Sequence, residues 1–191
     1  MCIRDRYIHI PFCKSRCNYC GFYSVAQIPT DRFISALIKE IEIKSRSFKE
    51  RKCDTLYFGG GTPSSLSINQ LKNVLQVIKE SFDISEDAEI TMEMNPSDMD
   101  DEYIEKTLEM GINRISVGIQ NNHDQLLKKI GRNHSAAGAE RVVKRAFRKG
   151  YRNISIDLMS ELPGQSVKSF ENTLKWAVHL PIVHMSCLLY T

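Results

Sequence analysis

Short apolar runs alternate along this chain with longer segments in which apolar residues recur every three or four positions. The short runs are typical of β-strands, and the longer periodic segments are typical of amphipathic helices. We expect strands over residues 7–12, 55–58, 89–94, 114–119, 153–159 and 182–188. The alternation of strand and helix extends over nearly the whole chain.

The expected helices carry signals at their ends. Ser67 is of a residue type that caps helix N-termini, and Gly111 and Gly150 can adopt the left-handed conformation that ends a helix. We therefore expect helices over residues 31–49, from Ser67 onward, over 102–110, over 136–149 and after the pair Pro163–Gly164.

Strands separated by helices are joined most simply as parallel neighbours through right-handed crossovers. The pattern predicts an α/β fold, a partial (β/α)6 barrel with parallel strands. Ligands bind at the carboxyl ends of the strands in such folds. The unusual residues of this chain follow the strands, so we expect the functional site there.

Composition and charge narrow the class of protein. With 191 residues the chain suits one domain, and its net charge of +3, without a basic stretch interleaved with aromatic residues, argues against nucleic-acid binding. We expect no signal peptide and no transmembrane segment, because no apolar run approaches ~20 residues. A cytoplasmic protein is expected, and in that reducing compartment grouped cysteines indicate metal ligands rather than disulfides.

Three cysteines follow the first strand within eight residues, namely Cys13, Cys17 and Cys20, called here the cluster cysteines. Thiolates bind soft metals, and a [4Fe-4S] cluster normally takes four cysteines, so this group predicts a cluster with one iron left for another ligand. The alternative is a structural zinc site with His9 as fourth ligand. Cys53 and Cys187 stand alone in apolar surroundings and are interpreted as small hydrophobic residues.

Glycine and polar residues occupy the ends of the later strands: Gly60, Gly61, Thr62, Glu93, Gln120, Arg132 and Asp157. Glycines let a backbone approach a ligand closely, although a glycine run can equally form an ordinary turn. A carboxylate in a strand expected to be buried on both faces needs a partner, either a cationic ligand or a base on a helix. The Gln120 amide and the Arg132 guanidinium suit a zwitterionic ligand. Each of these side chains is also common as a structural or surface polar group.

The stretch YIHIPFCKSRCNYCGFYS resembles the cluster motif of radical S-adenosylmethionine (SAM) proteins, in particular the family of oxygen-independent coproporphyrinogen III oxidases and related heme chaperones. The resemblance implies that the cluster cysteines hold three irons and that the fourth iron binds SAM. An electron from the cluster then splits the sulfonium to give a 5′-deoxyadenosyl radical. The resemblance also implies SAM contacts at Tyr7, Gly60, Gly61, Thr62, Glu93, Gln120, Arg132 and Asp157.

One position separates the two branches of this family. The oxidases carry a further cysteine two places after the third ligand, whereas the chaperones carry phenylalanine, and this chain has Phe22. The resemblance therefore implies a protein that binds heme and delivers it to respiratory proteins. The alternatives are the oxidase, which decarboxylates coproporphyrinogen III, and a zinc-stabilised domain. The heme ligand stays open among His9, His123, His134, His179 and His184, with a site in the missing part of the family's length as the alternative.

The resemblance covers residues 7–186, interpreted as a radical SAM core domain. Segments 1–6 and 187–191 depart from it, the latter by leaving the expected course of the sixth strand. Both are interpreted as atypical, non-native ends, so Cys2 has no assigned role. Family members are considerably longer, which implies that a C-terminal domain enclosing the porphyrin is missing.

Overall fold

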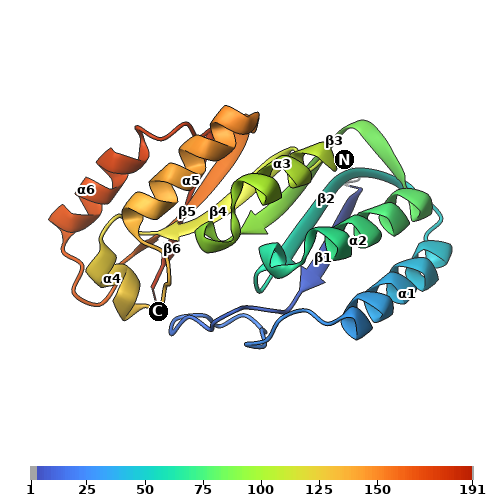
Figure 1. Ribbon diagram of the computed structural model, residues 1–191, viewed down its shortest axis with the longest axis horizontal. Helices are drawn as coiled ribbons and strands as arrows, with labels where there is room; N and C mark the ends of the chain where they lie inside the picture. Colours follow the sequence, from blue (N-terminus) through green and yellow to red (C-terminus); the bar gives the residue numbers. More distant parts are fainter. Residues whose placement is uncertain (1–3, 191) are drawn as a thin grey trace.

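The computed structural model describes residues 4–190, so residues 1–3 and 191, which include Cys2 and parts of both atypical ends, lie outside the described residues. Its framework is a six-stranded parallel sheet in which each strand pairs with the next along the chain (Figure 1). The strands are β1 Asp5–Ile10, β2 Lys52–Gly60, β3 Asp83–Met94, β4 Arg114–Gln120, β5 Asn153–Ser160 and β6 His184–Leu189. The predicted parallel α/β arrangement is confirmed.

Helices follow the strands: α1 Asp31–Ser47, η1 Pro63–Ser65, α2 Ile68–Ser81, η2 Pro96–Asp98, α3 Asp101–Glu109, α4 Asp124–Lys129, α5 Ala136–Lys149 and α6 Val167–Ala177. Ser67 caps α2 as predicted, because its side chain accepts from the Gln70 N–H while the Gln70 side chain accepts from the Ser67 N–H. Gly111 and Gly150, with φ of 96° and 124°, take the expected left-handed conformation after their helices. Among residues 4–190, no helix is long and apolar enough to cross a membrane.

Three elements differ from the sequence prediction. The pattern missed α4, which is only six residues long. Strand β3 begins at Asp83, because its first residues pair with Lys52 and Cys53 of β2 although Glu86 and Asp87 interrupt the apolar run. Residues 187–189 continue β6 and pair with residues 158–160 of β5, so the expectation that they leave the sixth strand is wrong. Backbone pairing with a neighbouring strand decides both strand lengths.

The two faces of the sheet differ in chemistry. On one face, beneath the helices, the strand side chains are apolar and fully or almost fully buried, as for Ile10, Phe58, Met92, Val117 and Ile156. The intervening positions carry polar groups, among them Tyr57, Glu93, Ser116 and Asp157. This second face is also largely buried, with Thr91 and Ser116 only 1% and 6% exposed, but it is polar rather than apolar.

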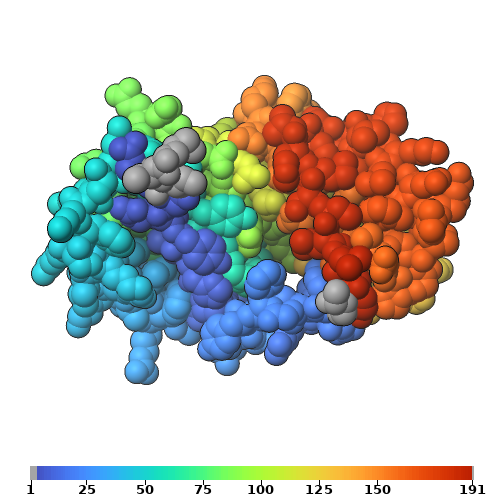
Figure 2. Space-filling model, turned by 180° about the vertical axis from the view of Figure 1, so that it is seen from behind, coloured from blue at the N-terminus to red at the C-terminus, as the bar shows by residue number. Residues whose placement is uncertain are grey.

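The polar face lines the inside of an incomplete barrel. Strands β1 and β6 are the two edges of the sheet and do not pair with each other. Figure 2 shows the hollow between them, with the chain that follows β1 crossing its lower side. A half-open barrel explains why polar side chains can point inward, since they face a space that a ligand can enter.

Candidate functional site

A cavity of about 320 Å³ lies at the carboxyl ends of the strands, between the sheet and the loop of residues 11–30, called here the cysteine loop. The cluster cysteines line it together with groups from the later strands. Of the predicted site residues the cavity contains Cys13, Cys17, Cys20, Gly60, Gly61, Thr62, Glu93, Gln120, Arg132 and Asp157. The fold therefore brings together ten residues that are spread over most of the sequence.

The three cluster cysteines are free thiols, with Cys13 buried and the other two half-buried. The Thr62 hydroxyl donates a hydrogen bond to Cys13 Sγ at 3.4 Å, and Arg132 Nη1 donates to Cys17 Sγ at 3.6 Å. Two of the three cluster sulfurs thus each accept a hydrogen bond from a polar side chain that lines the same cavity.

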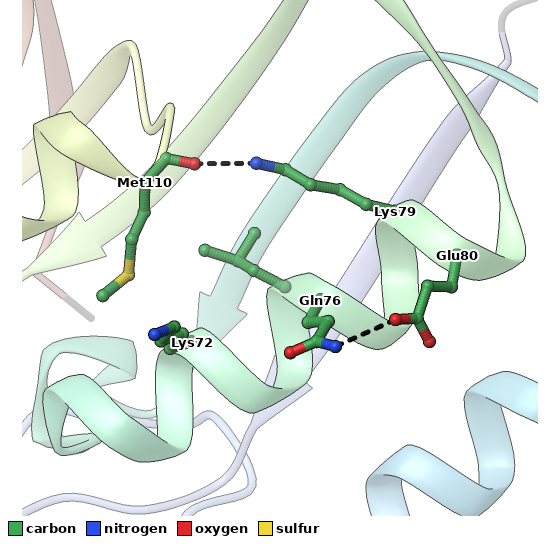
Figure 3. Close-up of a pocket in the computed structure, with 6 residues that line it drawn as sticks. Lys72, Gln76, Lys79, Glu80 and Met110 are labelled. Atoms are coloured by element: carbon green, nitrogen blue, oxygen red, sulfur yellow. Dashed lines mark hydrogen bonds between the residues drawn. The ribbon is translucent and has the colours of Figure 1, made fainter.

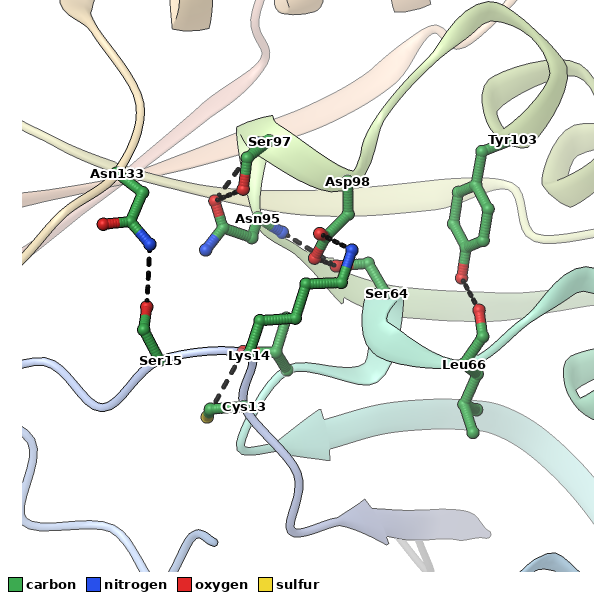
Figure 4. A network of polar contacts seen from close by, with 11 residues as sticks. Cys13, Lys14, Ser15, Ser64, Leu66, Asn95, Ser97, Asp98, Tyr103 and Asn133 are labelled. Carbon is green, nitrogen blue, oxygen red and sulfur yellow. Dashed lines mark hydrogen bonds and ion pairs between the residues drawn. The ribbon is translucent and has the colours of Figure 1, made fainter. Parts of the chain in front are cut away.

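Two residues between Cys13 and Cys17 fasten the cysteine loop to the barrel (Figure 4). Lys14 forms an ion pair of 2.6 Å with Asp98 of η2, whose side chain is only 3% exposed. Ser64 donates to the other oxygen of Asp98 at 2.9 Å, and Asn133 donates to Ser15 at 3.0 Å. These contacts fix the loop relative to the ends of β2, β3 and β4, so that its thiols face the cavity.

The glycine segment approaches the chain's own backbone. The Gly61 N–H donates to the Ile10 carbonyl at 2.8 Å, and the Thr62 N–H donates to the Phe12 carbonyl at 2.7 Å. A Cβ on Gly61 would lie 2.7 Å from Phe12 O, and Gly60 has φ of 115°, which favours glycine. Glycine is thus required here for packing against the start of the cysteine loop, and the same segment lines the cavity.

Glu93 accepts hydrogen bonds from the Tyr57 hydroxyl at 2.8 Å and from the Gly60 N–H at 3.3 Å. Burial raises the pKa of its carboxyl above the ordinary value, and the charge of Asp157 adds to this shift, whereas the hydrogen bond from Tyr57 opposes it. The alternative of an ion pair to a helix is wrong for this structure, since no such pair of Glu93 occurs in residues 4–190.

Asp157 of β5 also lines the cavity, two strands away from Glu93 of β3. It accepts from the Ser116 hydroxyl at 3.2 Å, and burial raises the pKa of its carboxyl, a shift that Ser116 and the charge of Arg114 oppose. Two inward-facing carboxylates, each disfavoured by burial, make a site suited to a cationic ligand.

Gln120 and Arg132 carry polar atoms without partners. Gln120 is 6% exposed and adopts φ of 70°, an uncommon conformation for a residue with a side chain. In the described part of the chain, Gln120 Oε1 and Arg132 Nε are buried without a hydrogen-bond partner, although Arg132 also donates to the Gly118 carbonyl. Buried polar groups are nearly always satisfied, so an acceptor and a donor left open beside the thiols indicate a ligand with both kinds of group.

Tyr7 does not line the cavity. It is 57% exposed, its ring stacks on that of Tyr57 at 6.0 Å, and its hydroxyl contacts His9 Nδ1 at 3.1 Å. Sequence reasoning missed Tyr57 and Ser116, which hold the two carboxylates. Both alternate with apolar residues along their strands, so the period of two could have identified them as inward-facing.

The donor set fits a cluster better than a single metal ion. No three His, Cys, Asp or Glu side chains within residues 4–190 come close enough to hold one ion, so the geometry does not support the zinc alternative. A [4Fe-4S] cluster distributes its ligands over separate irons, so the thiols need not converge on one point. The three thiols, the open acceptor of Gln120 and the open donor of Arg132 are the groups that a cluster with a zwitterionic ligand would require.

Comparison with known proteins agrees with this description. Residues 7–177 match the family described as "Radical SAM superfamily". The chain is 40% identical to the heme chaperone HemW of Lactococcus lactis, over 94% of this chain and 47% of that protein. It is also 40% identical to HemW of Bacillus subtilis, over 96% of this chain and 49% of that protein. The chain thus spans about half the length of the curated relatives that it matches.

A solved structure is similar over the same region. The coproporphyrinogen III oxidase HemN from Escherichia coli is a radical SAM enzyme that superposes with a TM-score of 0.91. The two chains are 29% identical, and the match covers 97% of this chain and 43% of that one. The partial barrel described above is therefore the fold of a radical SAM domain.

Proposed function

Because the chain belongs to the radical SAM superfamily, whose members use a [4Fe-4S] cluster and SAM, we propose that it forms the SAM-binding core of a HemW-type heme chaperone. The observation that carries the proposal is the identity of 40% to two curated heme chaperones over almost the whole of this chain. Heme as ligand, and respiratory proteins as recipients of the heme, are parts of this proposal.

The residues in the cavity divide into two roles under this proposal. The cluster cysteines hold the cluster, which, when bound, supplies one-electron reducing chemistry toward SAM. The groups proposed to contact SAM are Tyr7, Gly60, Gly61, Thr62, Glu93, Gln120, Arg132 and Asp157. Tyr7 is included because the family resemblance implies it, and its ring stacks on Tyr57, which lines the cavity.

The charges of this site suit such a ligand. Glu93 and Asp157 place carboxylates where a sulfonium or ammonium group would offset their burial. Arg132 and Gln120 offer a guanidinium donor and an amide acceptor that lack partners, which suits a carboxylate and an ammonium group. Thr62 and Arg132 also donate hydrogen bonds to the sulfurs of Cys13 and Cys17, and so orient these two thiols.

The second candidate is the oxidase, and the superposition with HemN favours it. Phe22 argues for the chaperone, since it lines the cavity with its side chain 68% exposed and cannot coordinate iron. A cysteine in this place would add a fourth thiol beside the cluster.

The test is anaerobic reconstitution of the chain with iron and sulfide, followed by a spectroscopic titration with heme. We expect a saturable heme spectrum and transfer of heme to an apo-heme protein. A full-length relative carrying this same barrel should leave coproporphyrinogen III unconverted in the presence of SAM and a reductant, even with its cluster fully loaded. Variants of the candidate ligands, namely His9, His123, His134, His179 and His184, would then identify the residue that binds the heme iron. Decarboxylation without heme binding would favour the oxidase.

A further inference from the structure

A groove of about 380 Å³ runs between η2 and α5, on the helix-covered side of the sheet. Three arginines of α5 line it, namely Arg141, Arg145 and Arg148. Pro96 and Ser97 of η2 and His134, which lies just before α5, complete its walls. The arginines are spaced four and three residues apart, so they stand on one face of the helix.

Two of these arginines have no partner among the residues that the structure describes. The neighbouring bases of α5 are neutralised, because Lys144 pairs with Glu140 at 2.6 Å and Lys149 pairs with Glu105. Arg145 pairs with Asp101 at 3.1 Å. Arg141 and Arg148 are exposed and form no hydrogen bond or ion pair with any residue in the range 4–190.

Other grooves on the same molecule are lined by both signs of charge. The groove between α2 and α3, drawn in Figure 3, has Lys72 and Lys79 beside Glu80, and Lys79 donates to the Met110 carbonyl at 3.0 Å. A second groove combines Arg46 and Arg51 with Glu42 and Glu80. The groove of α5, by contrast, has no acidic residue in its lining. Its positive charge is thus a specific feature of this surface.

Both walls of the groove are continuous in sequence with residues that hold the cysteine loop. On the η2 side, Asp98 follows Ser97 and pairs with Lys14. On the α5 side, Asn133 precedes His134 and donates to Ser15, while Arg132 donates to Cys17 Sγ. A molecule seated in the groove would therefore lie against the two segments that hold the loop of the cluster cysteines.

We propose that this basic groove docks an acidic protein that donates one electron to the cluster. Reductive cleavage of a sulfonium carbon–sulfur bond takes one electron, which leaves the sulfur as a neutral thioether and the carbon as a radical. The donor is therefore oxidised by one electron for each bond cleaved, and the cluster passes that electron to the sulfonium. Complementary charge orients such a partner and speeds its association. The groove has no aromatic platform for bases, which favours a protein over a nucleic acid. The inference rests on the cluster site proposed above and is independent of heme.

The experiment uses this chain and, as the probe, a flavodoxin, a small acidic flavoprotein. We expect the double variant Arg141→Glu with Arg148→Glu to lower the association rate at low ionic strength by about ten-fold or more. The matched control, Arg32→Glu with Arg46→Glu, makes the same change of charge on exposed positions of α1 and should bind like the unaltered chain. High ionic strength should bring all three chains to similar rates.

A second measurement follows reduction of the reconstituted cluster by the reduced flavodoxin, with dithionite as a small reductant that needs no docking surface. The groove variant should be reduced slowly by flavodoxin and normally by dithionite. Equal flavodoxin binding by the groove and control variants would overturn the proposal. A polyanion such as single-stranded DNA that binds in place of flavodoxin, with loss in the groove variant, would also overturn it. Failure of heme binding with intact flavodoxin docking would affect only the chaperone proposal.

Discussion

Replacing Gly61 by alanine tests whether β2 and the cysteine loop must remain in main-chain contact. The added Cβ would lie 2.7 Å from the Phe12 carbonyl oxygen and 3.0 Å from the Ile10 carbonyl oxygen, whereas ordinary contact begins at 3.4 Å. Main-chain atoms cannot rotate away as a flexible side chain can. The end of β2 and the residues after β1 would therefore have to separate.

The magnitude follows from the contacts that this separation weakens. These are the hydrogen bonds from Gly61 N to Ile10 O at 2.8 Å and from Thr62 N to Phe12 O at 2.7 Å. Each contributes about 1 kcal/mol net, so the free energy of unfolding should fall by about 2 kcal/mol. For a chain of this size the Tm should fall by roughly 4–8 °C. The shift would also displace Thr62, the donor to Cys13.

Gly21→Ala is the matched control, since a Cβ on Gly21 of the same loop would meet nothing within 4 Å. Thermal unfolding followed by circular dichroism should give Gly21→Ala an unchanged or slightly higher Tm, because alanine lowers the entropy of the unfolded chain. After reconstitution, the effect of SAM on the cluster's electron paramagnetic resonance spectrum should be reduced in Gly61→Ala alone. Equal Tm values for the two variants would refute the packing argument. An undiminished SAM effect in Gly61→Ala would refute a cofactor contact there.

Alanine in place of any one of the cluster cysteines should abolish the charge-transfer absorbance of the reconstituted protein, whereas Cys53→Ala and Cys187→Ala should retain it. Stably bound zinc in the anaerobically purified protein would contradict this prediction. Because burial raises the pKa of Glu93 above 4.5, its charged form destabilises the folded state at neutral pH. Glu93→Gln should therefore resist urea better than wild type at pH 7. This gain should vanish below about pH 4, where the carboxyl is protonated in both the folded and the unfolded state. A gain in stability that does not depend on pH would contradict this cause. Lys14→Met should lower the free energy of unfolding by about 2 kcal/mol, because the buried Asp98 carboxylate loses its cation. The reconstituted variant should also release iron to a chelator faster than Lys14→Arg, which keeps the charge. Equal rates of iron release from the two variants would contradict the anchoring role of Lys14.

Local pattern was sufficient for most of the architecture. The strand and helix periods, the cap at Ser67 and the glycine at position 150 all depend on residues close together in sequence, and the structure has each of them where expected. The pattern failed at α4, which is too short to show a period, and at the start of β3, where charged residues pair through their backbone. Hydrogen bonds between strand backbones form whatever the polarity of the side chains, so the polarity pattern could not predict where β3 begins.

For the candidate site, the sequence by itself determined the chemical groups and the edge of the sheet where they gather. The thiols of one short loop, the glycine segment and the polar residues that follow parallel strands were all readable, because parallel strands end at the same edge. What the pattern could not supply were partners distant in sequence, such as Tyr57 on Glu93, Ser116 on Asp157 and Lys14 on Asp98.

Only the tertiary structure decided which face of the sheet lines the cavity and which polar atoms stay unpaired. It placed Tyr7 outside the lining of the cavity, left Gln120 Oε1 and Arg132 Nε open, and gathered three arginines of α5 in one groove with η2. The physical reason is that a sequence period fixes which side chains share a face of one strand or helix. The packing of separate elements then decides what that face meets.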